Sequence, residues 1–542
     1  MTIRQCFFCR GLLAVILSAF LAPCHAHSGK ARFHAVVDTD GAADDLRTLC
    51  MLLGNREVEV LAVTTSEGAL LPDSAAVRVR ALLDSFYHEG VPVGAGRAVN
   101  APAPAWRAHS GTVDWGDAAT ATSGAGFPAA SALIAETLGE EEEKVVFIAL
   151  GALTNLYDVL RENPASGDRI DRIVWYNSRA EPLSGANFET DSVAARYVLA
   201  SGVPVTVVSA NPACPVVVTP ALIDSVAAVP NVYARKIAAT HRTPPLAKLV
   251  GERHLEAWDD LVAVYLFAPE LFSIRELNGT VRACELSDKS AAAEAQTRLT
   301  AILRGKPDSE SRVFYGFPVG GALYAADVVP IIDSAVARHG LSEWRAGVLT
   351  NELHGHLGIY ATIGVKMGIR AREYFNIGVD DILVTTYAGH KPPVSCMNDG
   401  LQVGTGASVG HGLITVAEID TPRPEARFTF KDKTIRLVLK PRYADRIRRD
   451  VKRGIELYGD LTEPYWQYVR ALALRYWLDF DRHEIFDMYV GDSHPSFRRN
   501  FQPRFRGWLR APSLSEHRTS GNAWRSCEPA SLGYRRAEFR CS

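Results

Sequence analysis

Three features are scarce in this chain of 542 residues, and each absence excludes a class of protein. The 59 Lys and Arg nearly balance the 61 Asp and Glu, so the formal net charge of −2 gives no global reason to expect nucleic acid or an acidic membrane as partner. The cysteines after residue 26 are far apart and contain no CxxC pair, which excludes a dense disulfide framework. No segment after residue 26 has the roughly 20 uninterrupted apolar residues of a transmembrane helix. With 47% hydrophobic and 22% charged residues, this length predicts a globular chain of two or three domains.

The first 26 residues differ from the rest and predict a secretory signal peptide. Basic residues precede an apolar run, Gly11 to Ala22, which is followed by Pro23-Cys24-His25-Ala26. We expect cleavage after Ala26 and export to a bacterial periplasm or the medium. The alternative is a lipid anchor on Cys24, which Pro23 disfavours because a small residue usually stands there.

Four carboxylates fall within eight residues directly after the apolar run Ala35-Val36-Val37. They are Asp38, Asp40, Asp44 and Asp45. A strand that ends in an acidic, Gly-containing loop places these oxygens at the carboxyl edge of a sheet, where open α/β folds bind ligands. Clustered carboxylates repel one another in a low dielectric, so a hard cation such as Ca²⁺ or Mg²⁺ fits among them. The alternative is a solvated acidic turn that caps the next helix.

Strand-like and helix-like segments alternate from Phe33 to about Gly340. The candidate strands are rich in Val, Ile or Leu, and they are His34–Val37, Val58–Thr65, Val145–Leu150, Arg172–Tyr176 and Val205–Ser209. Apolar residues at three- and four-residue spacing predict helices at Leu46–Leu53, Ser74–Phe86, Ser131–Leu138 and Ser192–Ala200. This alternation predicts an α/β fold with a mostly parallel sheet and helices on both faces. Gly111–Pro128 reads as a long loop.

Several segments in this order carry a resemblance to one family. They are Asp38 to Asp45 (D-T-D-G-A-A-D-D), Leu150 to Asn155 (L-G-A-L-T-N), Asn187 to Asp191 followed by Ala194-Ala195, and Trp258-Asp259 with Pro269 ten residues after the Asp. Together they resemble the inosine–uridine-preferring nucleoside hydrolases over about residues 33–340. Ala325–Asp327 and the apolar run after it look like that family's last strand and helix.

The resemblance implies a hydrolase that cleaves the N-glycosidic bond of nucleosides with a Ca²⁺-bound water. It implies that Asp40 is the general base and a metal ligand. Asp45, Asp259 and the backbone carbonyl of Leu150 would be the other metal ligands. Asp44 and Asn187 would bind ribose hydroxyls, and Asp38 would support the metal site from behind. The substrate would be a nucleoside or another N-ribosyl compound, and homo-oligomers are left open.

The Pro-Gly of the family's signature loop is Gly41-Ala42 here, and three further departures from the family pattern concern the sugar and the leaving base. The ribose-binding Asn after the second strand is Ala69, and the ribose-contacting Glu is Gly185. The His of the late His-Asp pair, which helps to protonate the leaving base, is Trp258. Each lost polar contact weakens sugar binding by roughly 1–3 kcal/mol. The alternative function is therefore a degenerate hydrolase that binds a nucleoside or sugar without turnover.

A second, smaller α+β domain is expected from Leu341 to about residue 490. His354, His356 and Cys396 form a soft N/S ligand set that suits Zn²⁺ or another transition metal. The alternatives are that the histidines are ordinary surface residues and that Cys396 is a buried thiol. The H-G-H segment, a Cys-containing turn and a later Gly-rich run resemble the domain found in the E component of formylmethanofuran dehydrogenase, over about residues 341–450. Arg442–Phe486 predicts helices whose aromatic residues pack as core. Residues 491–542 read as a disordered or aberrant tail.

Overall fold

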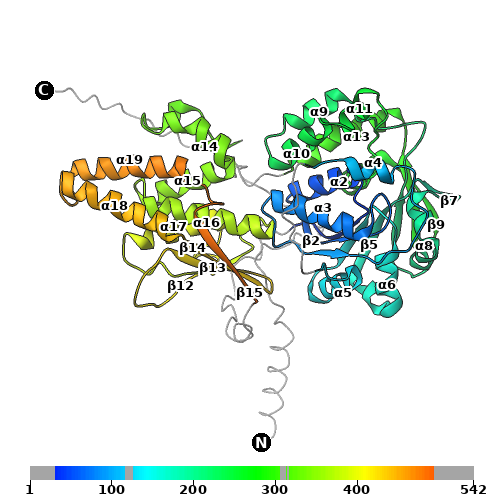
Figure 1. Ribbon diagram of the computed structural model, residues 1–542, viewed down its shortest axis with the longest axis horizontal. Helices are drawn as coiled ribbons and strands as arrows, with labels where there is room; N and C mark the ends of the chain where they lie inside the picture. Colours follow the sequence, from blue (N-terminus) through cyan, green and yellow to red (C-terminus); the bar gives the residue numbers. More distant parts are fainter. Residues whose placement is uncertain (1–30, 116–125, 306–312, 314–315, 493–542) are drawn as a thin grey trace, which may run out of the picture. The chain divides into compact units, whose positions relative to one another are not determined.

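The computed structural model describes residues 31–115, 126–305, 313 and 316–492 (Figure 1). The chain divides into two units, Met1–His494 and Pro495–Ser542, and every described residue belongs to the first. The signal peptide predicted at residues 1–26 and residues 493–542 of the predicted tail lie outside the described residues. The tail was predicted two residues too early, because residues 491 and 492 belong to a strand that ends at Asp492. No helix in the described ranges has both the length and the apolar character that a membrane span requires.

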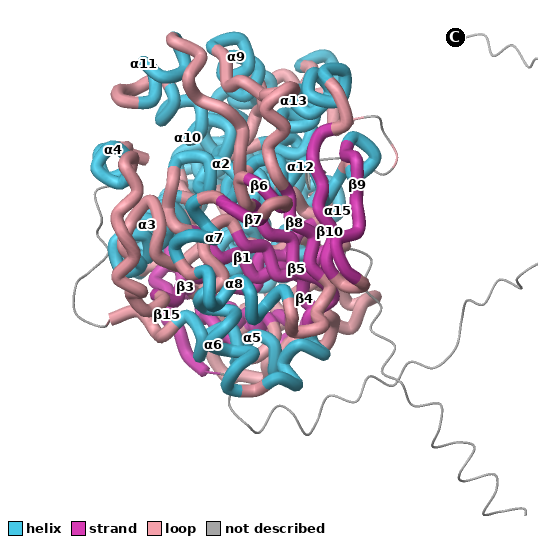
Figure 2. Tube along the Cα trace, turned by 90° about the vertical axis from the view of Figure 1, so that its right-hand side faces the viewer, coloured by secondary structure: helices cyan, strands magenta, loops and turns pink. Residues whose placement is uncertain are grey.

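An eight-stranded sheet organises the first half of the chain, in the order β3-β2-β1-β4-β5-β8-β10-β9. Its strands other than β2 are labelled in Figure 2. Its strands are β1 (Phe33–Thr39), β2 (Val58–Thr65), β3 (Val93–Ala95), β4 (Val145–Ala149), β5 (Ile170–Tyr176), β8 (Val205–Val208), β9 (Phe272–Asn278) and β10 (Val281–Leu286). Neighbouring strands run parallel except at the β9–β10 edge, which is antiparallel. The predicted mostly parallel sheet is confirmed.

Both faces of this sheet are covered by helices. Side chains alternate along β1, so that Ala35 and Val37 join one buried cluster while Val36 joins another on the opposite face. The first cluster includes residues of α2 (Ala43–Gly54), α3 (Pro72–Ser85), α9 (Pro220–Ala227), α10 (Val232–His241), α11 (Leu246–Gly251), α12 (Asp260–Phe267) and α13 (Lys289–Arg304). The second includes residues of α5 (Ala130–Glu140), α6 (Thr154–Glu162) and α8 (Ser192–Leu199). The strands and helices predicted for this half are confirmed to within a few residues.

One predicted strand is wrong. Ala325–Asp327 was expected to form the family's last strand, but the structure has turns there. Pro330, three residues later, has no N–H to donate to a sheet ladder, which disfavours a strand at this point. The helix that follows, α14 (Ile332–His339), buries Ile332 and Ala335 in the core around the second sheet. Gly340 ends α14 with a φ of +87°, as a glycine after a helix allows.

The second sheet has five strands in the order β12-β11-β13-β14-β15. They are β11 (Leu383–Thr386), β12 (Ile414–Val416), β13 (Glu425–Phe430), β14 (Lys433–Leu439) and β15 (Phe486–Asp492), with helices α15 (Leu341–His354), α16 (Ile359–Phe375), α17 (Met397–Thr405), α18 (Pro441–Tyr458) and α19 (Glu463–Asp479). The predicted helices in Arg442–Phe486 are confirmed up to Asp479, after which the chain returns to the sheet as β15. Of the aromatic residues expected in the core, Tyr465, Tyr476 and Trp477 are buried, but Trp466 is 42% exposed.

Glycines let α16 and α17 approach to backbone contact. A Cβ at Gly400 would overlap the carbonyl oxygen of Ala361, and a Cβ at Gly364 would overlap the carbonyl oxygen of Met397. These glycines explain the interrupted apolar pattern of this segment, because only hydrogen fits between the two helices at these points.

Candidate active site

The loop that follows β1 is held by its own side chains. Asp45 Oδ2 accepts hydrogen bonds from Thr39 Oγ1 at 2.6 Å and from the backbone N–H of Asp40 at 2.9 Å. The backbone N–H of Gly41 donates to Thr39 Oγ1 at 3.0 Å, and Gly41 has a φ of +80°. The tight turn therefore needs glycine, and it brings the carboxylates of β1 and α2 to the carboxyl edge of the sheet.

Asp40 is fixed from both sides by backbone donors. Its Oδ1 accepts from the N–H of Ala42 at 3.2 Å, and its Oδ2 accepts from the N–H of Ala69 at 2.9 Å. A Cβ at Gly68 would overlap the Asp40 carboxylate, so the segment after β2 wraps closely around this group. Burial raises the pKa of Asp40 to about 6, which the two backbone hydrogen bonds oppose. A carboxylate with such a pKa is ionised at pH 7 and is a better base than an ordinary aspartate.

Three carboxylates meet in a geometry that suits a cation. Asp44, Asp45 and Asp259 each offer an oxygen, these oxygens lie within 4.8 Å of one another, and all three residues are buried. Asp259 Oδ1 is buried without a hydrogen-bond partner. Burial, with the repulsion of neighbouring carboxylates, raises the pKa of both Asp45 and Asp259. The donor set fits a hard divalent cation, which would pair these charges and satisfy the orphaned oxygen. The structure thus brings together Asp45 and Asp259, which are 214 residues apart in the sequence.

Asp38 supports this edge of the sheet from within. Its Oδ1 accepts from Thr64 Oγ1 at 2.6 Å and from Asn155 Nδ2 at 2.7 Å. Its backbone carbonyl accepts from the N–H of Leu150 at 2.8 Å, which positions the end of β4 beside the acidic loop. Burial raises the pKa of Asp38 to about 6, and the hydrogen bonds oppose this rise. The role of Asp38 behind the metal site stays a prediction.

Asn187, on the short helix α7 (Ala186–Thr190), contacts backbone carbonyls. Its Nδ2 donates to Leu150 O at 2.7 Å and to Tyr176 O at 3.0 Å. The amide therefore aligns the carbonyl that was predicted to bind the metal, and leaves Asn187 Oδ1 as the atom that can meet a sugar hydroxyl. The roles of Leu150 and Asn187 stay predictions.

The three departures that concern the sugar and the leaving base have structural explanations. Ala69 is fully buried, and its backbone N–H is used by Asp40. Gly185 has a φ of +126°, and a Cβ there would overlap the side chain of Ser178, so no other residue type fits that conformation. Trp258 is partly buried and packs against the core on the α2 face of the sheet. None of the three positions offers the polar group that the family pattern has there.

Two polar groups near this edge were not predicted from the sequence. Glu67, which is buried, accepts from the backbone N–H of Val99 at 2.8 Å and of Asn100 at 3.1 Å and pairs with Arg107. Arg107 Nε in turn donates to Gly68 O at 2.9 Å. This pair attaches the segment after β3 to the segment that holds Asp40. The one feature of the sequence that could have indicated the pair is a glutamate at the end of an apolar strand.

A second unpredicted group lies beside Asp259. Arg47 pairs with Asp260, which is fully buried, and Arg47 Nη1 lies 2.9 Å from His241 Nε2. Burial and the nearby guanidinium lower the pKa of His241 to about 3. His241 is therefore neutral at pH 7, and Arg47 balances the charge of Asp260 so that it does not add to the acidic cluster.

The predicted metal ligands of the second domain lie around the loop between α15 and α16. His354 Nδ1 is 2.7 Å from Asp399 Oδ2, and His354 Nε2 is buried without a partner. The His354 and His356 rings lie 4.3 Å apart. Among the described residues, His354, His356 and Cys396 are not one of the groups whose ligand atoms all fall within 4.8 Å of one another. Their joint binding of a metal stays a prediction.

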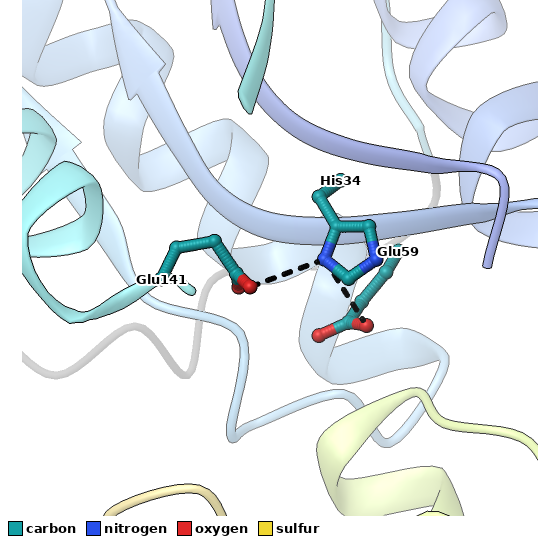
Figure 3. Close-up of side chains that lie close together, drawn as sticks. All are labelled: His34, Glu59 and Glu141. Atoms are coloured by element: carbon teal, nitrogen blue, oxygen red, sulfur yellow. Dashed lines mark ion pairs between the residues drawn. The ribbon is translucent and has the colours of Figure 1, made fainter. Parts of the chain in front are cut away.

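One other cluster of possible ligands was not predicted. His34, Glu59 and Glu141 come together near the start of β1, and His34 Nδ1 lies 3.4 Å from Glu141 (Figure 3). Lys431, from the turn between β13 and β14, places its Nζ 2.6 Å from both glutamates. The ammonium group already supplies the positive charge that these carboxylates require, so we interpret the cluster as an ion-pair contact between the two halves of the chain.

Two family models match this chain. The one described as inosine-uridine preferring nucleoside hydrolase matches residues 35–313, and the one described as FmdE, molybdenum formylmethanofuran dehydrogenase operon, matches residues 353–487. The pyrimidine-specific ribonucleoside hydrolase RihA of Shewanella oneidensis is 26% identical over 257 residues, which are 44% of this chain and 80% of that protein. A plant nucleoside hydrolase, PpNRh1, is 18% identical with a TM-score of 0.41, covering 50% of this chain and 99% of its own. The inosine-uridine preferring nucleoside hydrolase of Bacillus anthracis is 21% identical with a TM-score of 0.39, covering 49% and 99%.

The acidic loop, the segments around Leu150 and Asn187, and Asp259 all lie inside residues 35–313, which are more than half of the chain. The chain therefore belongs to the inosine-uridine preferring nucleoside hydrolase family, as a nucleoside N-glycosyl hydrolase joined to an FmdE-like domain.

Proposed function

We propose that the first domain cleaves the N-glycosidic bond of ribonucleosides with Ca²⁺ held by Asp40, Asp45, Asp259 and the carbonyl of Leu150. The observation that carries this proposal is the buried pair of Asp45 and Asp259, whose oxygens cluster with one of Asp44 and which includes an unpartnered oxygen of Asp259. Asp40 and the carbonyl of Leu150 are not members of this cluster, and they enter the proposal from the family pattern. When bound, such a cation lowers the pKa of a water molecule and clamps neighbouring sugar hydroxyls. Calcium suits an all-oxygen site that includes a backbone carbonyl.

Asp40 takes the proton of the attacking water. The water oxygen forms a bond to the anomeric carbon while the carbon–nitrogen bond breaks, so the base leaves with the bonding electron pair and takes up a proton from solvent, and Asp40 afterwards returns its own proton to solvent. Each oxygen of Asp40 already accepts one backbone N–H, which fixes the carboxylate and leaves a second lone pair on each for the proton. Asp44 and Asn187 Oδ1 accept hydrogen bonds from the sugar hydroxyls. Trp258 offers only an indole N–H, so the chain supplies no strong acid at that position.

The test is the release of free ribose from a panel of inosine, uridine, cytidine and adenosine. We expect release in Ca²⁺, its loss in a chelator, and its loss in Asp40→Ala, whereas the control Asp73→Ala, at an exposed position of α3, keeps full activity. A nitrophenyl riboside, whose leaving group needs no proton, should be cleaved faster than any natural nucleoside. No ribose from any of these substrates would exclude the proposed reaction.

The second candidate function is a binding module, favoured because Ala69, Gly185 and Trp258 lack the polar groups that the family pattern has at these positions. It predicts saturable nucleoside binding in calorimetry with no ribose released. Slow heat after the binding peaks, matched by ribose in the cell, would exclude it.

For the second domain we propose a transition metal bound at His354, with His356 and Cys396 as further ligands. The contact with Asp399 orients His354 so that Nε2 faces away as a ligand atom. We also propose export, because the N-terminal pattern is that of a signal peptide. Metal analysis of the purified protein tests the first of these, and N-terminal sequencing of protein from periplasmic extracts tests the second.

A further inference from the structure

The second domain has a cavity of about 340 Å³ that no part of the proposed hydrolase reaction uses. It lies where α19 faces the loop between α15 and α16. Its apolar floor is Leu357 and Val469, which are 9% and 8% exposed. This volume is at the small end of the range of ligand pockets, which suits a single ring system rather than a nucleotide or a peptide.

An aromatic surface stands open in this cavity. Trp466 lines it and leaves 42% of its surface exposed, although Tyr465, Tyr476 and Trp477 of the same helix are buried. The Trp466 indole meets the His356 ring edge to face at 5.8 Å. Indole faces bind planar rings by stacking, and the histidine fixes the orientation of this one.

The polar groups of the cavity add an acceptor. Glu463 lines it one helical turn before Gln467, whose Nε2 lies 3.4 Å from Glu463 Oε1. Arg470, the cation in the lining, donates through Nε and Nη2 to Asp327 at 2.6 and 2.9 Å, so its charge is balanced. No ion pair to Glu463 is found among the described residues. The cavity thus combines a stacking face with a carboxylate acceptor.

We propose that this cavity binds a free purine base, with the ring on Trp466 and its N–H edge on Glu463. Hypoxanthine has such an edge: its N1–H can donate a charge-assisted hydrogen bond to the Glu463 carboxylate. The source of the base rests on the proposed function, because N-glycoside hydrolysis releases a free base. Binding itself requires no catalysis. The second domain then acts on, or retains, a product of the first.

The experiment is calorimetric titration of the full chain with hypoxanthine. We expect Trp466→Ala and Glu463→Gln each to weaken binding at least about tenfold, the size that single stacking or charged contacts have. Matched controls are Tyr489→Ala, an aromatic residue 50% exposed on β15, and Glu456→Gln, an exposed carboxylate of α18, and both should bind as the unmodified chain does. 1-Methylhypoxanthine, which lacks the N1–H, should bind the unmodified chain about tenfold more weakly than hypoxanthine.

Two further results separate this proposal from the hydrolase site. Asp45→Asn should leave hypoxanthine binding unchanged, and a loss of binding in that variant would assign the base to the first domain and overturn the proposal. Equal affinity in Trp466→Ala, Glu463→Gln and the unmodified chain, or no binding at all, would also overturn it. Ribose release measured in the same samples reports on the proposed function independently.

Discussion

Replacing Asp45 by asparagine should make the cation-free protein more stable and at the same time abolish its response to Ca²⁺. Asp45 Oδ2 accepts from Thr39 and from the N–H of Asp40, and an amide oxygen can accept both bonds. The amide nitrogen would then face Asp44 and Asp259 in place of a carboxylate oxygen. The substitution removes one negative charge from the cluster and adds a donor to it.

The magnitude follows from the neighbouring carboxylates. Burial raises the pKa of Asp40 from 3.8 to about 6, so keeping that group ionised at pH 7 costs about 3 kcal/mol. Burial, followed by repulsion from Asp40 and Asp44, raises the pKa of Asp45 as well. We expect Asp45→Asn to gain about 1–3 kcal/mol without cation, or about 2–10 °C in Tm. The unmodified chain should gain about 2.7 kcal/mol from Ca²⁺ at a hundred times its Kd.

The assay is thermal unfolding at pH 7 in chelator and in a Ca²⁺ series. Asp45→Asn should melt above the unmodified chain in chelator and shift by less than about 1 °C on adding Ca²⁺. Its advantage should shrink as the pH falls below 7, because carboxyls with raised pKa values take up protons first in the folded unmodified chain. Asp224→Asn, an exposed carboxylate of α9, is the control and should behave as the unmodified chain. A lower Tm in chelator, or a full Ca²⁺ shift in Asp45→Asn, would refute the reasoning.

Three other predictions concern groups outside this cluster. Burial lowers the pKa of His88 from 6.5 to about 4, so about 3 kcal/mol of stability that is present above pH 6.5 is lost as the pH falls to about 4. In urea unfolding, the free energy of unfolding of His88→Gln should therefore depend less on pH than that of the unmodified chain, and an equal dependence would contradict this. Lys431→Met should cost about 1–2 kcal/mol at pH 7, because Glu59 and Glu141 lose the cation that they share, and the cost should be smaller at high salt, which screens the ion pairs; equal losses at low and high salt would argue against them. Asp399→Asn should weaken Zn²⁺ binding about 10–100-fold by releasing His354, measured by competition with a chelating dye, and an unchanged affinity would exclude His354 as a ligand.

The strands and the acidic edge could be predicted because their signals are local. The run from Phe33 to Thr39 is apolar up to its acidic end, and period and turn residues are enough to place such a strand. The partnership of Asp45 with Asp259 came from the resemblance to the hydrolase family, because no helix was predicted at Asp259 and no local pattern joins it to the acidic loop. In the structure both residues lie at helix starts, Asp45 in the first turn of α2 and Asp259 directly before α12.

The remaining contacts depend on residues that no local pattern joins. Nothing near Glu67 indicates that its partner is Arg107, and nothing near Lys431 indicates that its partners are two glutamates in the first half of the chain. The exposure of Trp466 could not be predicted from the sequence either. Buried and exposed residues follow one another closely along α19, and aromatic residues occur among both, so the pattern does not show which side of the helix faces solvent. The two sets of ion pairs and the exposure of Trp466 all depend on how elements distant in the sequence pack together.

The contact between α16 and α17 distinguishes the residues that the fold of the second domain requires from the residues that its predicted metal site requires. A methyl group at Gly364 or Gly400 meets backbone atoms of the facing helix, which no change of rotamer can move aside. Sequences that share this domain should therefore keep glycine at both positions even where His354, His356 or Cys396 have drifted. Conservation of the two glycines would then identify members of this fold, whereas conservation of the histidines and the cysteine would identify the members that still bind a metal.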